Sequence, residues 1–308
     1  MPEVYYNDYS SYLKQFFSHR AQKISIDAGF TCPNRDGSKG RGGCSYCDNK
    51  TFSPFYCSPS KSITTQLNEG IAFFAKKYKT QEYLAYFQSY TNTYDSIENL
   101  KNRYDEALAH PQVVGIVVST RPDCVSEEVV ELLASYTDRY FVSLEIGIES
   151  TNDNTLKYIN RQHTYADTKH AFSLAKNHSL HLGGHLIIGL PNETHNDIIT
   201  HAKRISQLPI ETLKLHQLQI IKGTAMADDY KRFPERYHLF SIDEYIEMVG
   251  KFLHHLRDDI VVERFSGESP QDKILAPRWG GIKNYAVAER IKKYLAEKKI
   301  YQGGGYYE

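Results

Sequence analysis

Three cysteines stand close together near the N-terminus, in the segment FTCPNRDGSKGRGGCSYCDN that spans residues 30–49. Cys32, Cys44 and Cys47 follow the spacing C-x(11)-C-x(2)-C. A structural zinc site uses four ligands and a disulfide uses two, so three thiolates favour an iron–sulfur cubane in which one iron keeps no protein ligand. The glycines of the loop let its backbone wrap around such a cluster, and its basic side chains would offset the negative charge of the cluster.

The spacing of these cysteines also allows a zinc site whose fourth ligand is Cys57 or His19. The chain holds five cysteines and begins without the charged-then-apolar order of an export signal, which predicts reduced thiols, metal or redox chemistry, and a cytoplasmic location. No run of about 18 apolar residues is present, so we expect no membrane contact. The 37 basic and 37 acidic residues cancel, so any contact with nucleic acid would have to be local.

The elements that must position these cysteines alternate along the chain. Short β-branched or aromatic runs predict six strands, and segments with helical spacing predict five helices between them. Such alternation predicts an α/β fold with a parallel sheet, either a doubly wound open sheet or an incomplete (β/α)6 TIM-like barrel. The predicted strands are 23–30, 83–90, 113–119, 140–148, 181–190 and 212–221, and the predicted helices are 62–79, 96–110, 126–136, 164–178 and 194–207.

The regular alternation stops near residue 226. We therefore predict a barrel over 1–226, with its cysteine loop at 30–49, and a C-terminal extension over 227–308 that packs on the barrel. The extension contains helical patterns at 241–257 and 284–299 with the strand-like DIVVERFSG between them. The final YQGGGYYE predicts a flexible tail.

The cysteine pattern, with an aromatic residue directly before the last cysteine, resembles the radical S-adenosylmethionine (SAM) superfamily. Further segments resemble the group that contains the Elongator catalytic subunit and oxygen-independent coproporphyrinogen oxidase, and within it the bacterial YhcC/YtqA (MnmL) type. Together they extend over most of the chain. These segments are YFQSYTNTY at 86–94, STRPD at 119–123, EIGIES at 145–150, NRQH at 160–163, HLIIGLPNET at 185–194 and LAPRW at 275–279.

The resemblance implies a barrel of the radical SAM type in which Cys32, Cys44 and Cys47 bind a [4Fe–4S] cluster. The open iron would take the amino and carboxylate groups of SAM, and an electron from flavodoxin, ferredoxin or a similar donor would release a 5′-deoxyadenosyl radical. The resemblance gives no role to Cys57 or Cys124.

The same resemblance implies cofactor-binding roles for single side chains, each with a plainer structural alternative. The glycine-rich motif that usually binds the amino group is absent after the second strand, so Gln88 is the candidate there. His185 stands where some relatives carry an acid, and it would either contact SAM or serve as a hydrogen-bonded core histidine. The remaining candidates are Tyr46 beside the adenine, Arg161 on the SAM carboxylate, Glu149 on the ribose hydroxyls and Gly189 in the segment that packs on the adenine.

Polar residues at alternate strand positions predict where the substrate binds. Glu145, Lys214 and His216, with Asp27, would face the lumen and supply catalytic groups, and buried structural ion pairs are the alternative. The resemblance implies a tRNA substrate, with carboxymethylaminomethyluridine at the wobble position converted to aminomethyluridine. A small metabolite such as a tetrapyrrole or carboxylate is the second hypothesis. The third is a non-catalytic, zinc-stabilised module that binds RNA or protein.

Overall fold

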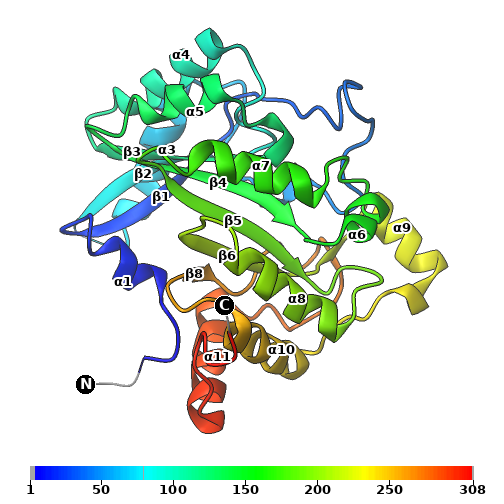
Figure 1. Cartoon of the computed structure of the whole chain (residues 1–308). Helices are drawn as coiled ribbons and strands as arrows, with labels where there is room; N and C mark the ends of the chain where they lie inside the picture. The colour runs from blue at the N-terminus through cyan, green and yellow to red at the C-terminus, as the bar shows by residue number, and fades with distance from the viewer. Residues whose placement is uncertain (1–3, 79, 307–308) are drawn as a thin grey trace.

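A computed structural model describes residues 4–78 and 80–306. Seven parallel strands form one curled sheet in the order β1-β2-β3-β4-β5-β6-β8 (Figure 1). The short strands β7 and β9 pair with each other in a separate antiparallel ribbon. The strands are Arg20–Ile26 (β1), Gln81–Phe87 (β2), Val113–Thr120 (β3), Phe141–Glu149 (β4), His181–Ile188 (β5), Thr212–Gln217 (β6), Ile220–Ile221 (β7), Val261–Arg264 (β8) and Ile274–Ala276 (β9).

Helices connect the strands and cover the convex face of the sheet (Figure 1). The α-helices are Tyr9–Leu13 (α1), Asn49–Phe52 (α2), Ile63–Ala75 (α3), Ile97–Leu108 (α4), Glu127–Ala134 (α5), Asp153–Tyr158 (α6), Tyr165–Ala175 (α7), His195–Ser206 (α8), Ala225–Arg232 (α9), Ile242–His255 (α10) and Asn284–Lys298 (α11), with short 3-10 turns at Pro122–Cys124 and Pro234–Arg236.

The predicted elements and fold class are confirmed. All six predicted strands and all five predicted barrel helices are present, with ends that differ by a few residues from the predicted ranges. Each of these five barrel helices begins where a side chain accepts a hydrogen bond from a free backbone N–H. Ser126, for example, accepts from Val129 N at 3.3 Å, and Ser96 accepts from Asn99 N at 3.3 Å.

The alternation within each strand separates a packed face from a polar face. In β4, the side chains of Leu144, Ile146 and Ile148 lie in the main hydrophobic core, together with apolar residues of the covering helices. Ser143 and Glu145 point to the other side, into the lumen of the half-barrel, as the period of two requires. The polar side chains of the strands therefore face the lumen.

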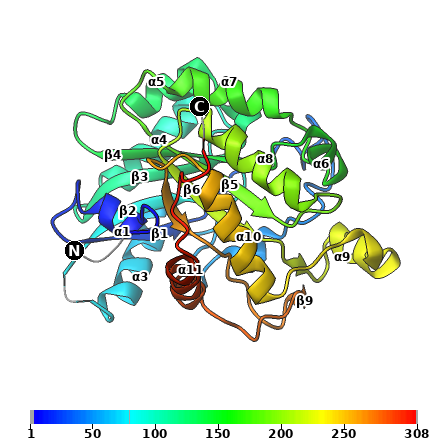
Figure 2. The same ribbon diagram turned by 60° about the horizontal axis from the view of Figure 1, so that its bottom comes forward.

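The C-terminal extension contributes a strand of its own to the barrel. β8, from the strand-like DIVVERFSG segment, pairs in parallel with β6 through Thr212 and Val261. α10 and α11 then pack beside this edge of the sheet (Figure 2). The division at residue 226 stays a prediction, although the sheet itself continues past it.

The prediction of a flexible tail is wrong for residues 301–306, and Tyr307 and Glu308 lie outside the described residues. Gln302 Nε2 donates to the carbonyl oxygens of Arg257 and Ile260 at 2.8 and 2.7 Å. Gly305 N donates to His254 O at 2.7 Å. The glycines that suggested mobility instead let the backbone run close to α10, since a Cβ on Gly305 would lie 2.5 Å from the His254 ring.

Aromatic side chains close the end of the lumen where the strands begin. Phe17, which follows α1, is buried, and its ring centroid lies 5.2 Å from that of Phe141 on β4. The rings of Phe141 and His181 stack at 4.2 Å. Because this end is blocked, the opposite edge, where the strands end, is the open mouth of the barrel. In the described part of the chain, none of the helices has the length and apolar character needed to cross a membrane.

Candidate active site

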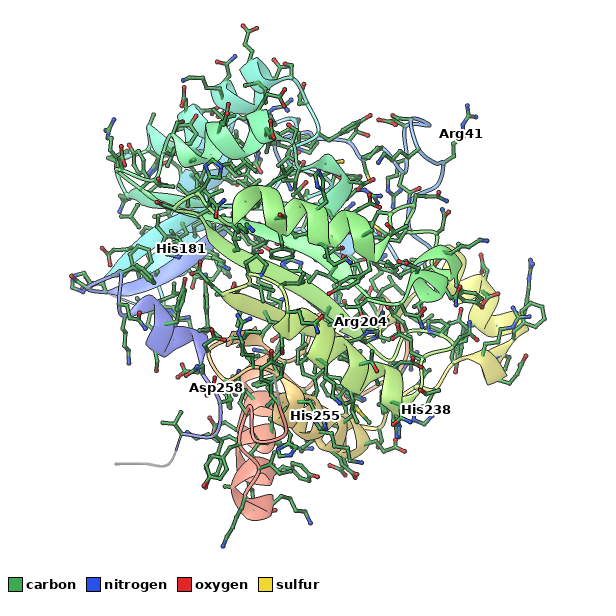
Figure 3. All side chains as sticks on the ribbon, viewed as in Figure 1. Arg41, His181, Arg204, His238, His255 and Asp258 are labelled. Carbon is green, nitrogen blue, oxygen red and sulfur yellow. The ribbon has the colours of Figure 1, made fainter. Side chains whose placement is uncertain are left out.

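The cysteine loop begins after β1 and lies at the open mouth of the barrel. Backbone hydrogen bonds fold it tightly: Arg35 N donates to Cys32 O at 2.8 Å, and Cys47 N donates to Cys44 O at 3.0 Å. Gly43 N donates to Asn34 O at 2.8 Å and joins the two halves of the loop. Figure 3 shows Arg41 at the outer end of this loop and His181 at the opposite end of the sheet.

Nitrogen donors surround two of the three thiol sulfurs. Asn34 Nδ2 lies 3.6 Å from Cys44 Sγ, and Arg161 Nη1 lies 3.4 Å from the same sulfur. Asn49 Nδ2 lies 3.6 Å from Cys47 Sγ. Donors and a buried positive charge at these distances stabilise thiolates and the negative charge of a cluster.

This donor set fits an iron–sulfur cluster. Within residues 4–78 and 80–306, no three His, Cys, Asp or Glu side chains converge as ligands of a single metal ion. The three thiolates of a cubane bind three different irons, so they are expected to stand apart and not to converge on one point. Burial, together with the neighbouring Cys44, raises the pKa of the Cys47 thiol, and iron would remove that cost by replacing the proton.

Arg161 connects the cysteine loop to the end of β4. Its Nη2 donates to Gly147 O at 2.9 Å and lies 3.2 Å from Glu149 Oε1, while its Nε donates to His163 Nε2 at 2.9 Å. With Nη1 on Cys44, each of the three guanidinium nitrogens has a partner, and these contacts use four of its five N–H groups. The buried arginine therefore holds a thiol, a strand end and a carboxylate in one fixed arrangement.

The end of β4 is shaped to receive this guanidinium. A Cβ at Gly147 would lie 2.5 Å from Arg161 Nη2 and 2.7 Å from Glu149 Oε1, so only glycine leaves room for the pair. Glu149 itself has a φ of +62°, and the register with β5 shifts between Gly147 and Glu149. A non-glycine residue in this conformation is strained, and such strain is typical of binding sites.

Three other predicted cofactor residues lie around the same mouth. Tyr46 sits between the last two cysteines and packs against a small apolar cluster that includes Leu190 and Met226; burial raises the pKa of its phenol. Gln88 follows β2 and accepts a hydrogen bond from Ser25 Oγ at 3.2 Å. Gly189 follows β5 with a φ of +91°, a conformation that glycine adopts without strain.

A buried group of charges lies deeper in the lumen, and we call it the lumen ion group: Lys23, Glu145, Lys214 and Glu263. Glu145 is its centre, with Oε2 at 2.6 Å from Lys214 Nζ and Oε1 at 2.8 Å from Lys23 Nζ. Glu263 lies 2.7 Å from Lys23 and 3.3 Å from Lys214. Two positive and two negative charges balance one another, which reduces the cost of burying them.

His185 belongs with this group. Its Nε2 lies 2.9 Å from Glu145 Oε2, and its ring centroid lies 5.8 Å from that of His216. The buried Tyr86 hydroxyl accepts from Lys214 Nζ at 3.0 Å and from Ser119 Oγ at 3.2 Å. The structure thus joins His185 to the predicted catalytic residues, at the level of the lumen and not at the cysteine loop.

The environment drives the pKa values of these groups apart. Burial lowers the pKa of Lys214 to about 8, although Glu145 and Glu263 oppose the shift. Burial acts on Lys23 in the same direction, but there the two glutamates outweigh it and raise its pKa. Burial and the nearby Arg264 lower the pKa of His216, so its imidazole is neutral at pH 7. The lumen therefore holds one lysine that loses its proton readily beside a neutral histidine.

Sequence reasoning missed two members of this site, Lys23 and Glu263. Lys23 could have been found from the sequence, because residues two apart on a strand share a face. Lys23 shares its face with Ser25, whereas Ile24 and Ile26 form the apolar face of the same strand. Glu263 could not have been found in this way, because the sequence of neither segment shows that β8 pairs with β6. Asp27, which was expected in the lumen, lies past the end of β1, where its carboxylate accepts from Gly29 N at 3.1 Å.

The comparisons with known proteins identify the class to which this chain belongs. The family model described as the radical SAM superfamily matches residues 32–205, and the model described as the radical SAM C-terminal domain matches residues 210–297. A half-barrel with three cysteines at its mouth is the arrangement of this class, and the chain belongs to the radical SAM superfamily.

Particular relatives resemble the chain over nearly its full length. It is 31% identical to the uncharacterized protein YtqA of Bacillus subtilis over 98% of this chain and 92% of YtqA. It is 33% identical to the protein YhcC of Escherichia coli over 96% of this chain and 93% of YhcC. The structure of the archaeal Methanocaldococcus infernus Elp3, lacking residues 1–46, shares the fold with a TM-score of 0.70 at 18% identity, over 92% of this chain and 64% of that one.

Proposed function

We propose that this chain is a radical SAM enzyme that acts on the wobble uridine of tRNA and converts carboxymethylaminomethyluridine to aminomethyluridine. The observation that carries the proposal is the placement of Arg161, which contacts Cys44 of the cysteine loop and Glu149 at the end of β4. It puts a carboxylate-binding cation directly beside the predicted cluster. The mouth of the barrel thus combines the groups that SAM requires.

The roles of the chain's own residues follow from their positions. Cys32, Cys44 and Cys47 would hold the cluster, which with SAM bound would supply a 5′-deoxyadenosyl radical to take a hydrogen atom from the carboxymethyl CH2 of the substrate. Return of one electron to the oxidised cluster and addition of water would then break the N–C bond, release the carboxymethyl group as glyoxylate and leave the aminomethyl group. The guanidinium of Arg161 binds the SAM carboxylate and keeps Cys44 oriented. The remaining cofactor contacts come from Gln88 to the amino group, Glu149 to the ribose, and Tyr46 and Gly189 to the adenine.

The lumen ion group supports a substrate that carries both an amine and a carboxylate. Lys214 and the neighbouring His185 and His216 offer N–H groups to an anion, whereas Glu145 offers an acceptor to an ammonium group. A carboxymethylaminomethyl side chain has one of each. The uridine would have to leave its stack and enter the lumen for these contacts, as bases do in enzymes that modify them.

The reaction also needs a source of electrons. We assign this role to a flavodoxin, a ferredoxin or a similar small carrier in the cytoplasm, where reduced thiols and such donors coexist. Family membership favours this chemistry over a zinc-stabilised binding module, since the matched region begins at Cys32 itself.

The experiment follows two products at once. The cluster is reconstituted without oxygen, and dithionite, SAM and bulk tRNA from a strain lacking the gene are added. We expect 5′-deoxyadenosine to form and aminomethyluridine to appear in digested tRNA, and Cys44→Ala to abolish both. Cys57→Ala is the matched control, because the Cys57 thiol donates to Ser25 O at 3.0 Å outside the cysteine loop.

Each failure points to a different error. If Cys44→Ala still formed 5′-deoxyadenosine, the cluster assignment would be wrong. If the wild-type protein formed 5′-deoxyadenosine while the nucleosides of tRNA stayed unchanged, the substrate assignment would be wrong, and a small metabolite would be the next substrate class to test.

A further inference from the structure

A cavity of about 730 Å³ lies outside the proposed reaction site, between the LAPRW segment and α11. Arg278 and Trp279 line it from the LAPRW segment, Lys283 lines it from the residue before α11, and Tyr285 and Arg290 line it from α11 itself. Figure 2 shows β9 and α11 at the lower side of the view, and the loop that joins them contributes residues 278–283 to the lining of the cavity. The functional proposal above gives no role to any of these residues.

The charge of this cavity differs from that of the chain as a whole, whose formal net charge is zero. Three cations line it, and its lining residues include no aspartate or glutamate. Lys283 pairs with Glu268 at 2.9 Å. In the part of the chain that the structure describes, Arg278 and Arg290 have no carboxylate within ion-pair distance. Two unpaired guanidinium groups at one cavity favour a phosphate-bearing ligand.

Aromatic rings stand beside these cations. The Tyr285 side chain is 73% exposed, which is unusual for a ring of this size on an amphipathic helix. Trp279 is held in place, since its indole N–H donates to Phe240 O at 3.0 Å and its ring lies 5.1 Å from that of Tyr245. Exposed aromatic faces next to arginines are the combination that binds single-stranded nucleic acid, because every base has a face to stack.

The cavity adjoins the barrel mouth. A smaller cavity next to it shares Trp279, Gly281, Ile282 and Lys283 and is also lined by Gln217, the last residue of β6. Gln217 in turn accepts from Gly267 N at 2.8 Å. The last residue of β6 lies at the same edge of the sheet as the cysteine loop, and Gln217 has the strand parity of the core residues Leu213 and Leu215. The cavity therefore lies outside the lumen but near its mouth, where a nucleotide next to an inserted uridine can bind.

We propose that this cavity binds a nucleotide of the RNA substrate that flanks the reacting uridine. Arg278 and Arg290 bind its phosphate, and Tyr285 stacks on its base against the wall formed by Trp279. The inference rests on the proposed function, since it assumes that the substrate is RNA. These cations would let a chain without net charge bind the RNA polyanion at one place on its surface.

The test measures binding apart from catalysis. The probe is a fluorescein-labelled anticodon stem-loop RNA, and its anisotropy is followed with the whole protein at about 50 and 200 mM salt. We expect Arg278→Ala with Arg290→Ala to weaken binding about tenfold and to reduce the salt dependence of the affinity. Tyr285→Ala should weaken binding to a similar degree at both salt concentrations, because stacking is not ionic.

The matched control is Lys293→Ala on the same helix, since Lys293 is an exposed cation outside the cavity that pairs with Glu297 at 3.7 Å. It should bind RNA as the wild type does. In all variants the slow formation of 5′-deoxyadenosine without RNA should be unchanged, because none of these residues contacts the cysteine loop.

Three results would overturn the inference. If tRNA is modified by the wild type and the Arg278, Arg290 and Tyr285 variants bind the stem-loop normally, the cavity has no part in RNA binding although the proposed function stands. If those variants bind RNA normally but accept electrons from reduced flavodoxin more slowly, the cavity is a docking site for the acidic donor. A wild type that binds no RNA removes the inference and the tRNA substrate together.

Discussion

Arg161 Nη1 lies 3.4 Å from Cys44 Sγ, although 117 positions separate the two residues in the sequence. The contact joins the loop after β1 to the turn after α6, at the mouth of the barrel. A guanidinium that is already fixed by Gly147 O and His163 cannot move away from the sulfur without breaking those hydrogen bonds. The arginine is thus set in position before any cofactor binds, which lowers the entropic cost of binding.

Replacement of Arg161 by lysine tests this arrangement. Lysine keeps the charge but has a single nitrogen, so it cannot contact Cys44, Gly147 and Glu149 together. We expect kcat/KM for SAM in 5′-deoxyadenosine formation to fall about tenfold or more, chiefly through a higher KM. Gln162→Ala, an exposed neighbour, serves as the control. Unchanged SAM kinetics in the lysine variant would show that the positive charge alone matters.

Lys214 gives the protein a specific dependence on pH. Its pKa is about 8 in the folded protein and 10.5 for an ordinary lysine. Between these values the unfolded chain binds more protons than the folded one, so the free energy of unfolding rises with pH. Below pH 8 the lysine is charged in both states and the full cost of burying it remains. Between about pH 7.5 and pH 9.5 we expect a gain of about 2 kcal/mol from this group.

Lys214→Met isolates that contribution. The variant lacks the titrating group, so its stability in urea unfolding should fall relative to the wild type as the pH rises through this window. Lys251→Met, on the exposed face of α10, should follow the wild-type profile. Parallel profiles for the wild type and Lys214→Met would mean that Lys214 titrates as an ordinary lysine.

Two adjacent phenylalanines offer a matched test of the closed end of the barrel. Phe17 is 8% exposed and Phe16 is 44% exposed. Phe17→Ala should lower the free energy of unfolding by about 3 kcal/mol, because it leaves a cavity beside Phe141. Phe16→Ala should cost about 1 kcal/mol or less. Equal losses, measured by urea unfolding, would show that Phe17 does not seal the lumen.

The order of the barrel elements could be predicted because each strand and helix carries its own local signal. The period of two in β4 and the serines that cap α4 and α5 are properties of short segments. The cysteine spacing likewise lies within one loop. The family followed from motifs of this kind, and the comparisons confirm it.

The tail shows where local reasoning fails. The glycines of YQGGGYYE predict mobility, but their lack of side chains lets the segment pack against α10 and form hydrogen bonds with it. Whether a glycine loosens a chain or allows a close approach depends on what lies beside it.

Local sequence patterns were enough to predict the repeating strands and helices, the polar face of β4 and the three cysteines that follow β1. The tertiary structure alone decided which distant charges meet. It placed Arg161 on Cys44, and it brought Lys23 and Glu263 from opposite edges of the curled sheet to Glu145 and Lys214. The physical reason is that periodicity records only which face a side chain takes, whereas a buried ion group depends on curvature and strand pairing that bring separate faces together.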